Sequence, residues 1–497
     1  MRVLRLARPI SLVALAAALL SPGLWLGANF DAAVYALAGV RIRDGFMPYT
    51  DLQDNKPPGL YLLNAFGQTI LPWLSPWLVS WLATLAFTAA TILVLDTLMR
   101  RRLLPVASFL MSVVCLVGIA AHPLSLGGGH TESFAILPLV LGLWAVASLP
   151  SSPRSAALVG FLASVALVFS LQSLPAAVVL GAAAVFIKAT PREMVRRAAA
   201  ALACGAVVPL AIAAWLVARG ALGDAIDQVM TYNVAYLAAS GGLGHMLPVV
   251  GLLLGGLLFP AGIGVVRMIR DPGAFDRLDW LCLAWVLGSL ASLAYGNRVY
   301  LHYLIVVLPP LTLLSARGFE WLLAAFRSPG RGNRGRAIGL IGANAVLLTI
   351  SIVTMVDLTL LTTGIAADDV AVTNRTADWI KANTPADATV YLWGDDAYIF
   401  LQSDRRPYDR HVYQDPMVTK GYWTPAKTAA LLSEWEASPP PVIVETRSAV
   451  PMFRAPYEPD RPPNYDTLGP LRDFVRGHYK LAATFGDHDI YELVAAG

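Results

Sequence analysis

Charged residues are scarce in this sequence, and their scarcity limits the class of protein that it can encode. Asp, Glu, Lys and Arg make up 14% of the 497 residues, whereas soluble globular chains carry about 25%. The hydrophobic share is 56%, and apolar runs repeatedly approach the roughly 20 residues that cross hydrocarbon. These features exclude an ordinary soluble protein and predict a polytopic α-helical membrane protein. The net charge of +4 comes largely from short basic turns, so no nucleic-acid partner is expected.

Cysteine is also rare. Cys115, Cys204 and Cys282 all lie in apolar runs and form no CxxC pair, which is typical of small core residues and excludes a disulfide framework. The sequence has no HExxH motif or comparable spacing of metal ligands, so we predict no metal-binding residue.

Eleven apolar segments can be placed along the chain. The connections between them are largely alternately rich and poor in Lys and Arg, as the positive-inside rule requires. The first outer connection is the exception, since it contains Arg41, Arg43 and Lys56, which we attribute to a site. An odd number of spans puts the N-terminus in the cytoplasm and the C-terminal region outside; losing or gaining a span in the short, Ala-rich stretch 155–188 would reverse the side of the C-terminal region. The segments lie near 9–27, 76–99, 103–121, 132–149, 155–171, 174–188, 198–218, 247–268, 278–295, 299–316 and 338–362.

The N-terminus resembles a signal peptide in its charge pattern. Arg2, Arg5 and Arg8 precede an apolar run that ends near Gly27. This run is longer than the 7–15 apolar residues of a typical signal peptide. We therefore expect a retained helix.

The first outer loop, residues 28–75, concentrates charge in an otherwise apolar third of the chain. Such a cluster beside a bilayer favours a functional site over a solvated connector, the alternative, because charges there are costly unless they lie in water or in a site. Helical spacing predicts two interfacial helices, 31–44 and 60–71, and Pro57-Pro58 stiffens the turn between them. The charged residues are Asp31, Arg41, Arg43, Asp44, Asp51, Asp54 and Lys56.

The composition changes to that of a soluble domain near Ala366, which predicts a membrane domain over 1–362 and an extracytoplasmic α/β domain over 363–497. Helices and strands alternate in the second part. We expect a long loop over Arg447–Pro470. The expected helices are 376–383, 425–436 and 471–479, and the expected strands are 389–393, 441–445, 479–484 and 488–494.

Further polar clusters occur at the outer ends of apolar segments, so folding of the bundle could bring them into one cavity. A carboxylate there could take a proton from an attacking hydroxyl, and cations could offset charge on a phosphate leaving group. Asp31 is the candidate base, Lys56 and Arg298 are the candidate phosphate ligands, and Arg41 and Arg43 are reserves. The clusters contain His130 and Glu132 in GGGHTES, and Asn297, Arg298, Tyr300 and His302 in GNRVYLHY.

Each candidate has a structural alternative. Lys56 and Arg298 could be snorkelling anchors at helix ends. Glu132 could stabilise the first turn of the following helix through the helix dipole. His130 and His302 could be interfacial or core histidines.

The order of these motifs resembles the GT-C superfamily of integral-membrane glycosyltransferases, in the branch of protein O-mannosyltransferases and the lipid A aminoarabinose transferase. The resemblance covers most of the membrane region, and its most specific part pairs Asp31 with Lys56-Pro57-Pro58. The stretch TADWIKANTPADATVYLWG also resembles the C-terminal domains of bacterial members. Many relatives carry Asp-Glu where this chain has Asp31-Ala32, so a second carboxylate role would fall to Glu132 or be absent.

The resemblance implies transfer of a hexose or pentose, with inversion, from a polyprenyl-phosphate donor to a glycan, lipid or protein acceptor at the outer face of a bacterial inner membrane. It matches Asp31 to the family's first-loop catalytic Asp and Lys56 to the lysine near the lipid phosphate. Glu132 is the candidate for a second catalytic carboxylate. The donor-phosphate ligands would be Lys56, Arg298 and His302, and membrane lipids would surround the site. No cofactor is required by the sequence, although a divalent cation (Mg²⁺, Mn²⁺ or Ca²⁺) is left open. The substrate-binding candidates are Tyr35, Tyr49, Asp54, His130, Asn297 and Tyr300.

Two rival functions remain. A transporter or flippase of a lipid-linked saccharide would need charges deep within several spans and paired broken helices, whereas the charges here gather at one face. A non-catalytic scaffold that binds envelope glycan would not need Asp31.

Overall fold

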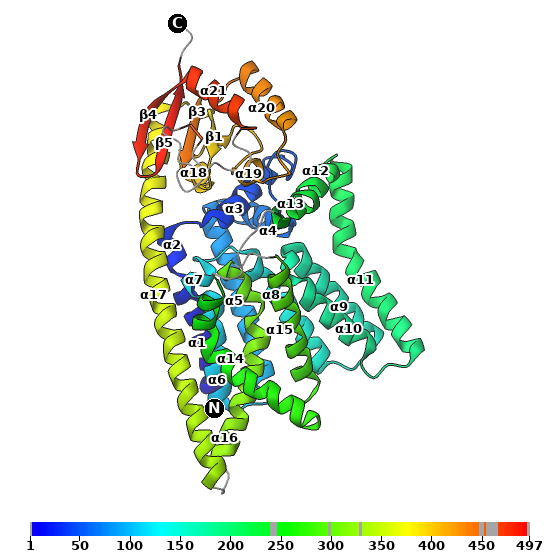
Figure 1. Cartoon of the computed structure of the whole chain (residues 1–497). Coiled ribbons are helices and arrows are strands. Elements are labelled where there is room, and N and C mark those ends of the chain that lie inside the picture. The colour runs from blue at the N-terminus through cyan, green and yellow to red at the C-terminus, as the bar shows by residue number, and fades with distance from the viewer. Residues whose placement is uncertain are drawn as a thin grey trace. The chain divides into compact units, whose positions relative to one another are not determined.

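A computed structural model of the protein describes residues 2–238, 246–296, 300–327, 331–446, 452–453 and 466–494 (Figure 1). The chain forms two compact units, each built from three separate stretches. The first unit comprises Met1–Trp25, Trp81–Ala213 and Gly241–Thr363, and the second comprises Leu26–Ser80, Ala214–Ser240 and Gly364–Gly497.

The long apolar helices carry the first unit. Each predicted apolar segment is largely helical; the tenth is split into a 3-10 turn, η5 (Leu301–Val306), and α16, which runs on to Arg327. Helices α8, α9 and α10 lie side by side (Figure 1). The long helices are α1 (Arg2–Leu20), α5 (Pro76–Arg100), α6 (Pro105–Ala120), α8 (Thr131–Ser148), α9 (Pro153–Phe169), α10 (Leu174–Phe186), α11 (Pro191–Ala218), α14 (Met246–Arg270), α15 (Arg277–Gly296), α16 (Leu308–Arg327) and α17 (Arg331–Asn383).

Among the described residues, seven helices are long and apolar enough to cross a membrane. Three further apolar helices, α6, α9 and α10, are shorter. The eleven-span count and its topology stay predictions. Short elements connect the helices: α2 (Pro22–Leu26), α7 (His122–Ser125), η1 (Leu171–Ser173) and η4 (Pro272–Ala274).

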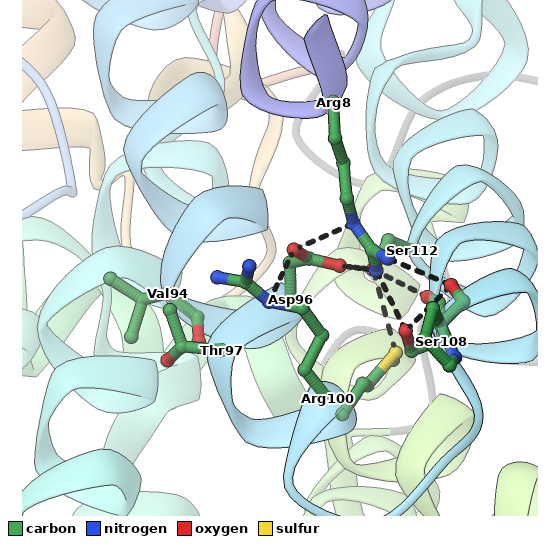
Figure 2. A network of polar contacts seen from close by, with 9 residues as sticks. Arg8, Val94, Asp96, Thr97, Arg100, Ser108 and Ser112 are labelled. Carbon is green, nitrogen blue, oxygen red and sulfur yellow. Dashed lines mark hydrogen bonds and ion pairs between the residues drawn. The ribbon is translucent and has the colours of Figure 1, made fainter. Parts of the chain in front are cut away.

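A charged network joins α1, α5 and α6 (Figure 2). The Arg8 guanidinium forms an ion pair with Asp96, and its Nη1 donates to the carbonyl of Pro105 at 2.7 Å. Asp96 also accepts from Ser112 Oγ at 2.8 Å and lies 3.2 Å from Arg100 Nε. Because removing one partner would leave the buried Asp96 carboxylate undercompensated, this network fixes the mutual positions of the three helices.

The second unit contains the first loop, whose predicted helices are observed as α3 (Phe30–Arg43) and α4 (Gly59–Ile70). The two helices pack closely at Gly39, where a Cβ atom would lie 2.7 Å from Asn64 Cβ. Their placement at a membrane surface stays a prediction. The remaining helices of this unit are α12 (Leu222–Ile226), η2 (Asp227–Tyr232), α13 (Asn233–Ala238), α18 (Tyr398–Ser403), α19 (Asp415–Val418), α20 (Pro425–Ala437) and α21 (Gly469–His478).

A five-stranded sheet of order β2-β1-β3-β5-β4 forms the C-terminal part of this unit. Strand β1 is parallel to β2 and β3, while β5 is antiparallel to β3 and β4. Buried Trp393, Trp435 and Leu471 belong to its core. The strands are β1 (Thr389–Trp393), β2 (Arg406–Pro407), β3 (Val442–Thr446), β4 (Tyr479–Phe485) and β5 (His488–Leu493).

The predicted strands are therefore present within one residue at most ends, and helices 425–436 and 471–479 correspond to α20 and α21. The sequence missed β2, α18 and α19. It also missed that one continuous helix, α17, connects the last apolar segment to the predicted helix 376–383. Most of the loop expected over 447–470 lies outside the described residues.

Candidate functional site

Asp31 lies in the first turn of α3, where the local sequence favours a carboxylate. The preceding Asn29 caps the helix by accepting a hydrogen bond from the Ala32 amide at 3.1 Å. A negative charge at this end of a helix is stabilised by the helix dipole. Asp31 is partly buried, so the helix start presents an acidic group that retains some access to solvent.

The backbone of Lys56 is fixed by a tight turn. Tyr49 adopts a positive φ of 72° and is fully buried, and its amide donates to the carbonyl of Leu52 at 2.8 Å. The Tyr49 hydroxyl then donates to the Lys56 carbonyl at 2.8 Å. Left-handed backbone at a non-glycine residue costs free energy and persists only where its surroundings impose it. The turn therefore holds Lys56 in a defined place just before Pro57-Pro58.

Asp54 is the centre of this turn. Its buried carboxylate accepts hydrogen bonds from the Tyr61 hydroxyl, from the Tyr413 hydroxyl at 3.0 Å and from the Asn55 amide at 2.7 Å. Burial raises the pKa of Asp54, and the hydrogen bond from Tyr61 opposes this increase. The charge of Lys56 also lowers the pKa of Asp54, whereas the charge of Asp31 raises it. Asp31 and Lys56 thus act on the same carboxyl group.

Two amide side chains from a distant stretch complete the turn. Gln228, in the π-helical η2, accepts from the Asp54 amide at 3.0 Å and donates to the Tyr49 carbonyl at 2.6 Å. Asn233 exchanges two hydrogen bonds of 2.9 Å with Asn55. Single π-helical turns often occur at functional sites. The sequence reasoning missed Gln228, Asn233, Tyr61 and Tyr413; the only signal for the first two was their position in a connection expected on the outer side.

Three of the substrate-binding candidates are buried within this arrangement. Tyr35 is 1% exposed and its ring lies 5.8 Å from that of Tyr61. Tyr49 and Asp54 are buried as described above. Their burial favours a supporting role for the loop, and their contact with substrate stays a prediction.

Within the first unit, the structure brings His130 and His302 together. Their rings stack with centroids 4.2 Å apart and planes 9° apart. Tyr300 stacks on His302 at 5.5 Å, and Tyr303 meets it edge-on at 4.7 Å. Two imidazoles complete neither a three-ligand nor a four-ligand metal set by themselves, so a divalent cation stays a prediction.

Glu132 is 2% exposed in the first turn of α8, and its Oε1 accepts from Ser170 Oγ at 3.0 Å. This position fits both a helix-stabilising and a catalytic carboxylate. The preceding turn needs glycine, because Gly127, Gly128 and Gly129 have φ values of 82°, 114° and 90°. Asn297 and Arg298 lie outside the described residues.

No family model matches the sequence, and no curated protein matches it. Solved structures do match. ArnT from Cupriavidus metallidurans, bound to undecaprenyl phosphate, has a TM-score of 0.60 at 15% identity, over 98% of each chain. The Archaeoglobus fulgidus oligosaccharyltransferase, tethered to an acceptor peptide with the NVT sequon, has a TM-score of 0.53 at 13% identity, over 98% of this chain and 74% of that one.

These similarities establish the fold. The protein has the fold of the GT-C membrane glycosyltransferases, a polytopic α-helical architecture with a small C-terminal sheet. The resemblance read from Asp31 and Lys56-Pro57-Pro58 predicted this fold.

Proposed function

We propose that the protein is a membrane glycosyltransferase that moves a sugar from a polyprenyl-phosphate donor to a glycan, lipid or protein acceptor. The observation that carries the proposal is that the first loop holds both reactive groups in fixed backbone positions: Asp31 lies in the capped first turn of α3, and the Lys56 carbonyl accepts a hydrogen bond from Tyr49. The fold supports it, because a solved structure with that fold, ArnT, holds undecaprenyl phosphate.

In the proposed reaction Asp31 accepts the proton of the acceptor hydroxyl while that oxygen forms a bond to the anomeric carbon. The bond from this carbon to the donor phosphate oxygen breaks, and polyprenyl phosphate leaves with the electron pair. Lys56 offsets the negative charge that develops on the leaving phosphate. Attack from the side opposite the phosphate inverts the anomeric centre.

The other candidates extend this scheme. Glu132 would be the second catalytic carboxylate, and Arg298 and His302 would bind the donor phosphate together with Lys56. His130, Asn297 and Tyr300 would contact substrate. Whether the transferred sugar is a hexose or a pentose follows from the assay below.

We also propose a placement in a bacterial inner membrane, with the N-terminus in the cytoplasm and residues 28–75 and 363–497 outside. This placement suits a lipid-carried donor, because nucleotide sugars stay in the cytoplasm. Membrane residues 1–362 would then supply the donor's route from the lipid.

A reconstitution assay tests the function. Purified full-length protein in liposomes is mixed with labelled polyprenyl-phosphate sugars extracted from membranes and with an extract of envelope acceptors. We expect label in the acceptor fraction and release of polyprenyl phosphate, both lost in Asp31→Asn. Movement of label across the bilayer without transfer would identify a flippase instead.

A further inference from the structure

A cavity lies within the second unit, and Thr50 and Asp51 of the turn before Lys56 belong to its lining. Its volume is about 450 Å³, and neither Asp31 nor Lys56 lines it. The end of α3 and the turn after it form one wall, and residues 407–411 together with α20 form the others. Three cations and three carboxylates line it, namely Arg41, Arg410, Lys427, Asp51, Asp409 and Glu434.

Arg41 is a cation of this lining with buried hydrogen-bond donors that are not satisfied by the described residues. The residue is more than nine-tenths buried, yet its Nε and Nη1 atoms find no hydrogen-bond partner among the described residues. Its guanidinium lies 3.3 Å from the centroid of the Phe46 ring, and no ion pair joins Arg41 within the described part of the chain. Burial lowers the pKa of Arg41, and the charge of Arg406 acts in the same direction, whereas the charges of Asp44 and Asp51 raise it. A buried guanidinium in this state favours an anion that accepts from its open donors.

His411 supplies a second open polar atom in the same lining. Its Nδ1 lies 2.9 Å from Asp409 Oδ2, and the same carboxylate accepts from the His411 amide at 2.8 Å. This contact puts a proton on Nδ1. The Nε2 atom is buried and has no hydrogen-bond partner in the part of the chain that the structure describes, so it can accept from a hydroxyl when neutral or donate to an anion when protonated.

Most of the other charged groups of the lining already have a partner. Asp51 accepts from the Met47 amide at 2.7 Å. Arg410 lies 3.5 Å from Asp224. Lys427 lies 3.5 Å from the Tyr422 ring centroid and 4.0 Å from Asp227. An incoming anion therefore meets Arg41 as its principal charge partner.

Aromatic rings form the apolar part of the cavity. Phe46, Tyr408 and Trp423 line it, and Trp423 meets His411 edge-on at 5.4 Å. Rings beside fixed polar groups suit a ligand with both an apolar face and hydroxyls. A sugar ring has both, and the Arg41 donors add a requirement for negative charge.

We propose that this cavity binds an anionic saccharide, a sugar unit that carries a carboxylate or a phosphate. Arg41 takes the anionic group, His411 Nε2 pairs with a hydroxyl, and the aromatic rings cover a face of the sugar. The inference goes beyond the proposed transfer reaction, because binding here requires neither Asp31 nor Lys56. It adds a glycan-recognition site to the second unit, built from the first loop and the C-terminal part of the chain.

Saturation-transfer NMR on the full-length protein in detergent tests the proposal. The probes are glucuronate and glucose 6-phosphate, which separate a carboxylate from a phosphate source. Glucose is the neutral comparison, and inorganic phosphate, which has no observable protons, is measured as a competitor of the sugar signal. We expect at least one anionic sugar to bind tightly, and glucose and inorganic phosphate at least tenfold more weakly. Equal binding of glucose, binding of inorganic phosphate as tight as that of the sugars, or no binding of either anionic sugar would overturn the proposal.

Variants assign the site. Arg41→Gln should weaken binding of the anionic sugar at least tenfold, and Arg41→Lys should weaken it less. His411→Asn should weaken binding about threefold or more. Arg43→Gln is the matched control, since Arg43 is exposed on the same helix and does not line the cavity; its binding should stay unchanged. Unfolding temperatures within a degree of wild type establish that a variant is folded. Unchanged binding in folded Arg41→Lys and His411→Asn would place the sugar elsewhere.

The Asp31→Asn variant separates this inference from the proposed function. It should lose transfer and keep the NMR signal. If the wild-type protein shows no transferase activity but still binds the anionic sugar through Arg41, the proposed function is wrong and the inference about the cavity stands.

Discussion

Tyr413 and Asp54 are separated by 359 positions in the sequence and are joined by a hydrogen bond of 3.0 Å. The carboxylate that Tyr413 reaches is the one on which both Asp31 and Lys56 act. Through this bond, a residue close to the C-terminal sheet helps to fix the first loop. The loop and the C-terminal part of the second unit are therefore expected to lose order together.

The hydrogen bond gives the first prediction. Tyr413→Phe removes one of three donors to the buried Asp54 carboxylate, so the free energy of unfolding should fall by about 1–3 kcal/mol. Thermal unfolding in detergent and proteolysis of the loop measure this loss. Tyr408→Phe is the control, because its hydroxyl bonds to the Ser438 carbonyl in a more exposed setting. Equal loss in both variants would contradict a special role for Tyr413.

Asp31→Asn tests the proposed base. The variant keeps the shape of the side chain and removes its capacity to accept a proton, so the transfer rate should fall about 10²–10⁴-fold with donor binding largely intact. The change is measured in the reconstitution assay. Asp44→Asn, at the exposed other end of α3, should retain activity. Near-normal turnover in Asp31→Asn would remove it from this role.

Lys56→Ala tests the proposed phosphate ligand. Loss of the cation should weaken the affinity for the donor about tenfold or more and leave the affinity for the acceptor nearly unchanged. Lys56→Arg should recover part of the loss, because the charge is restored with a different geometry. Donor titrations at saturating acceptor measure the effect, and an unchanged donor affinity in Lys56→Ala would count against the assignment.

Two acidic residues after β1 predict how stability depends on pH. Burial, together with the charges of Asp415 and Asp396, raises the pKa of Asp395 to about 7; burial also raises that of Asp396 to about 6. Because both values exceed the usual 3.8, the folded state favours the protonated forms. Their stabilisation is complete below about pH 4 and is lost as pH rises through about 6 to 7.

Asp395→Asn should therefore raise the unfolding temperature at pH 8 and change it little at pH 4. A gain of about 2–4 °C corresponds to roughly 1 kcal/mol in a unit of 150–250 residues. Scans at both pH values measure the difference, with the exposed Asp473→Asn as control. The predicted direction of the pH dependence would be wrong if the unfolding temperature of the wild type rose from pH 5 to pH 8 and Asp395→Asn gave no gain.

The proposed topology can be measured with a reporter fused after Gly497. Alkaline phosphatase, active only outside the cytoplasm, should be active there, and a reporter placed after Arg102 should be inactive. A cytoplasmic signal at Gly497 would mean that the number of spans is even.

Local features of the sequence predicted much of the fold. Periodicity and turn residues located β1, the β4–β5 hairpin around Gly486, and the two helices of the first loop. The continuity of α17 was missed because the drop in hydropathy after residue 362 was read as a boundary. The helix continues to Asn383 and ends two residues before Pro385, where the ring disfavours further helix.

Sequence reasoning selected candidate site residues only where their chemistry differed from that of the surrounding residues. Asp31 and Lys56 were selected because charged residues beside a bilayer are costly unless they lie in water or in a site, and their roles stay predictions. Gln228 and Tyr413 do not differ from their sequence neighbours in this way, and their roles depend on contacts across 179 and 359 positions. Pairings over such separations are set by tertiary packing, which spacing along one sequence does not contain.

The most direct test of the central claim is mass spectrometry of envelope glycans and lipid-linked sugars from cells that carry the wild-type protein, Asp31→Asn or no copy of the gene. We predict that one glycan modification disappears and one polyprenyl-phosphate sugar accumulates, identically in the last two strains. An unchanged profile, or full modification in the Asp31→Asn strain, would contradict the claim that Asp31 acts in sugar transfer.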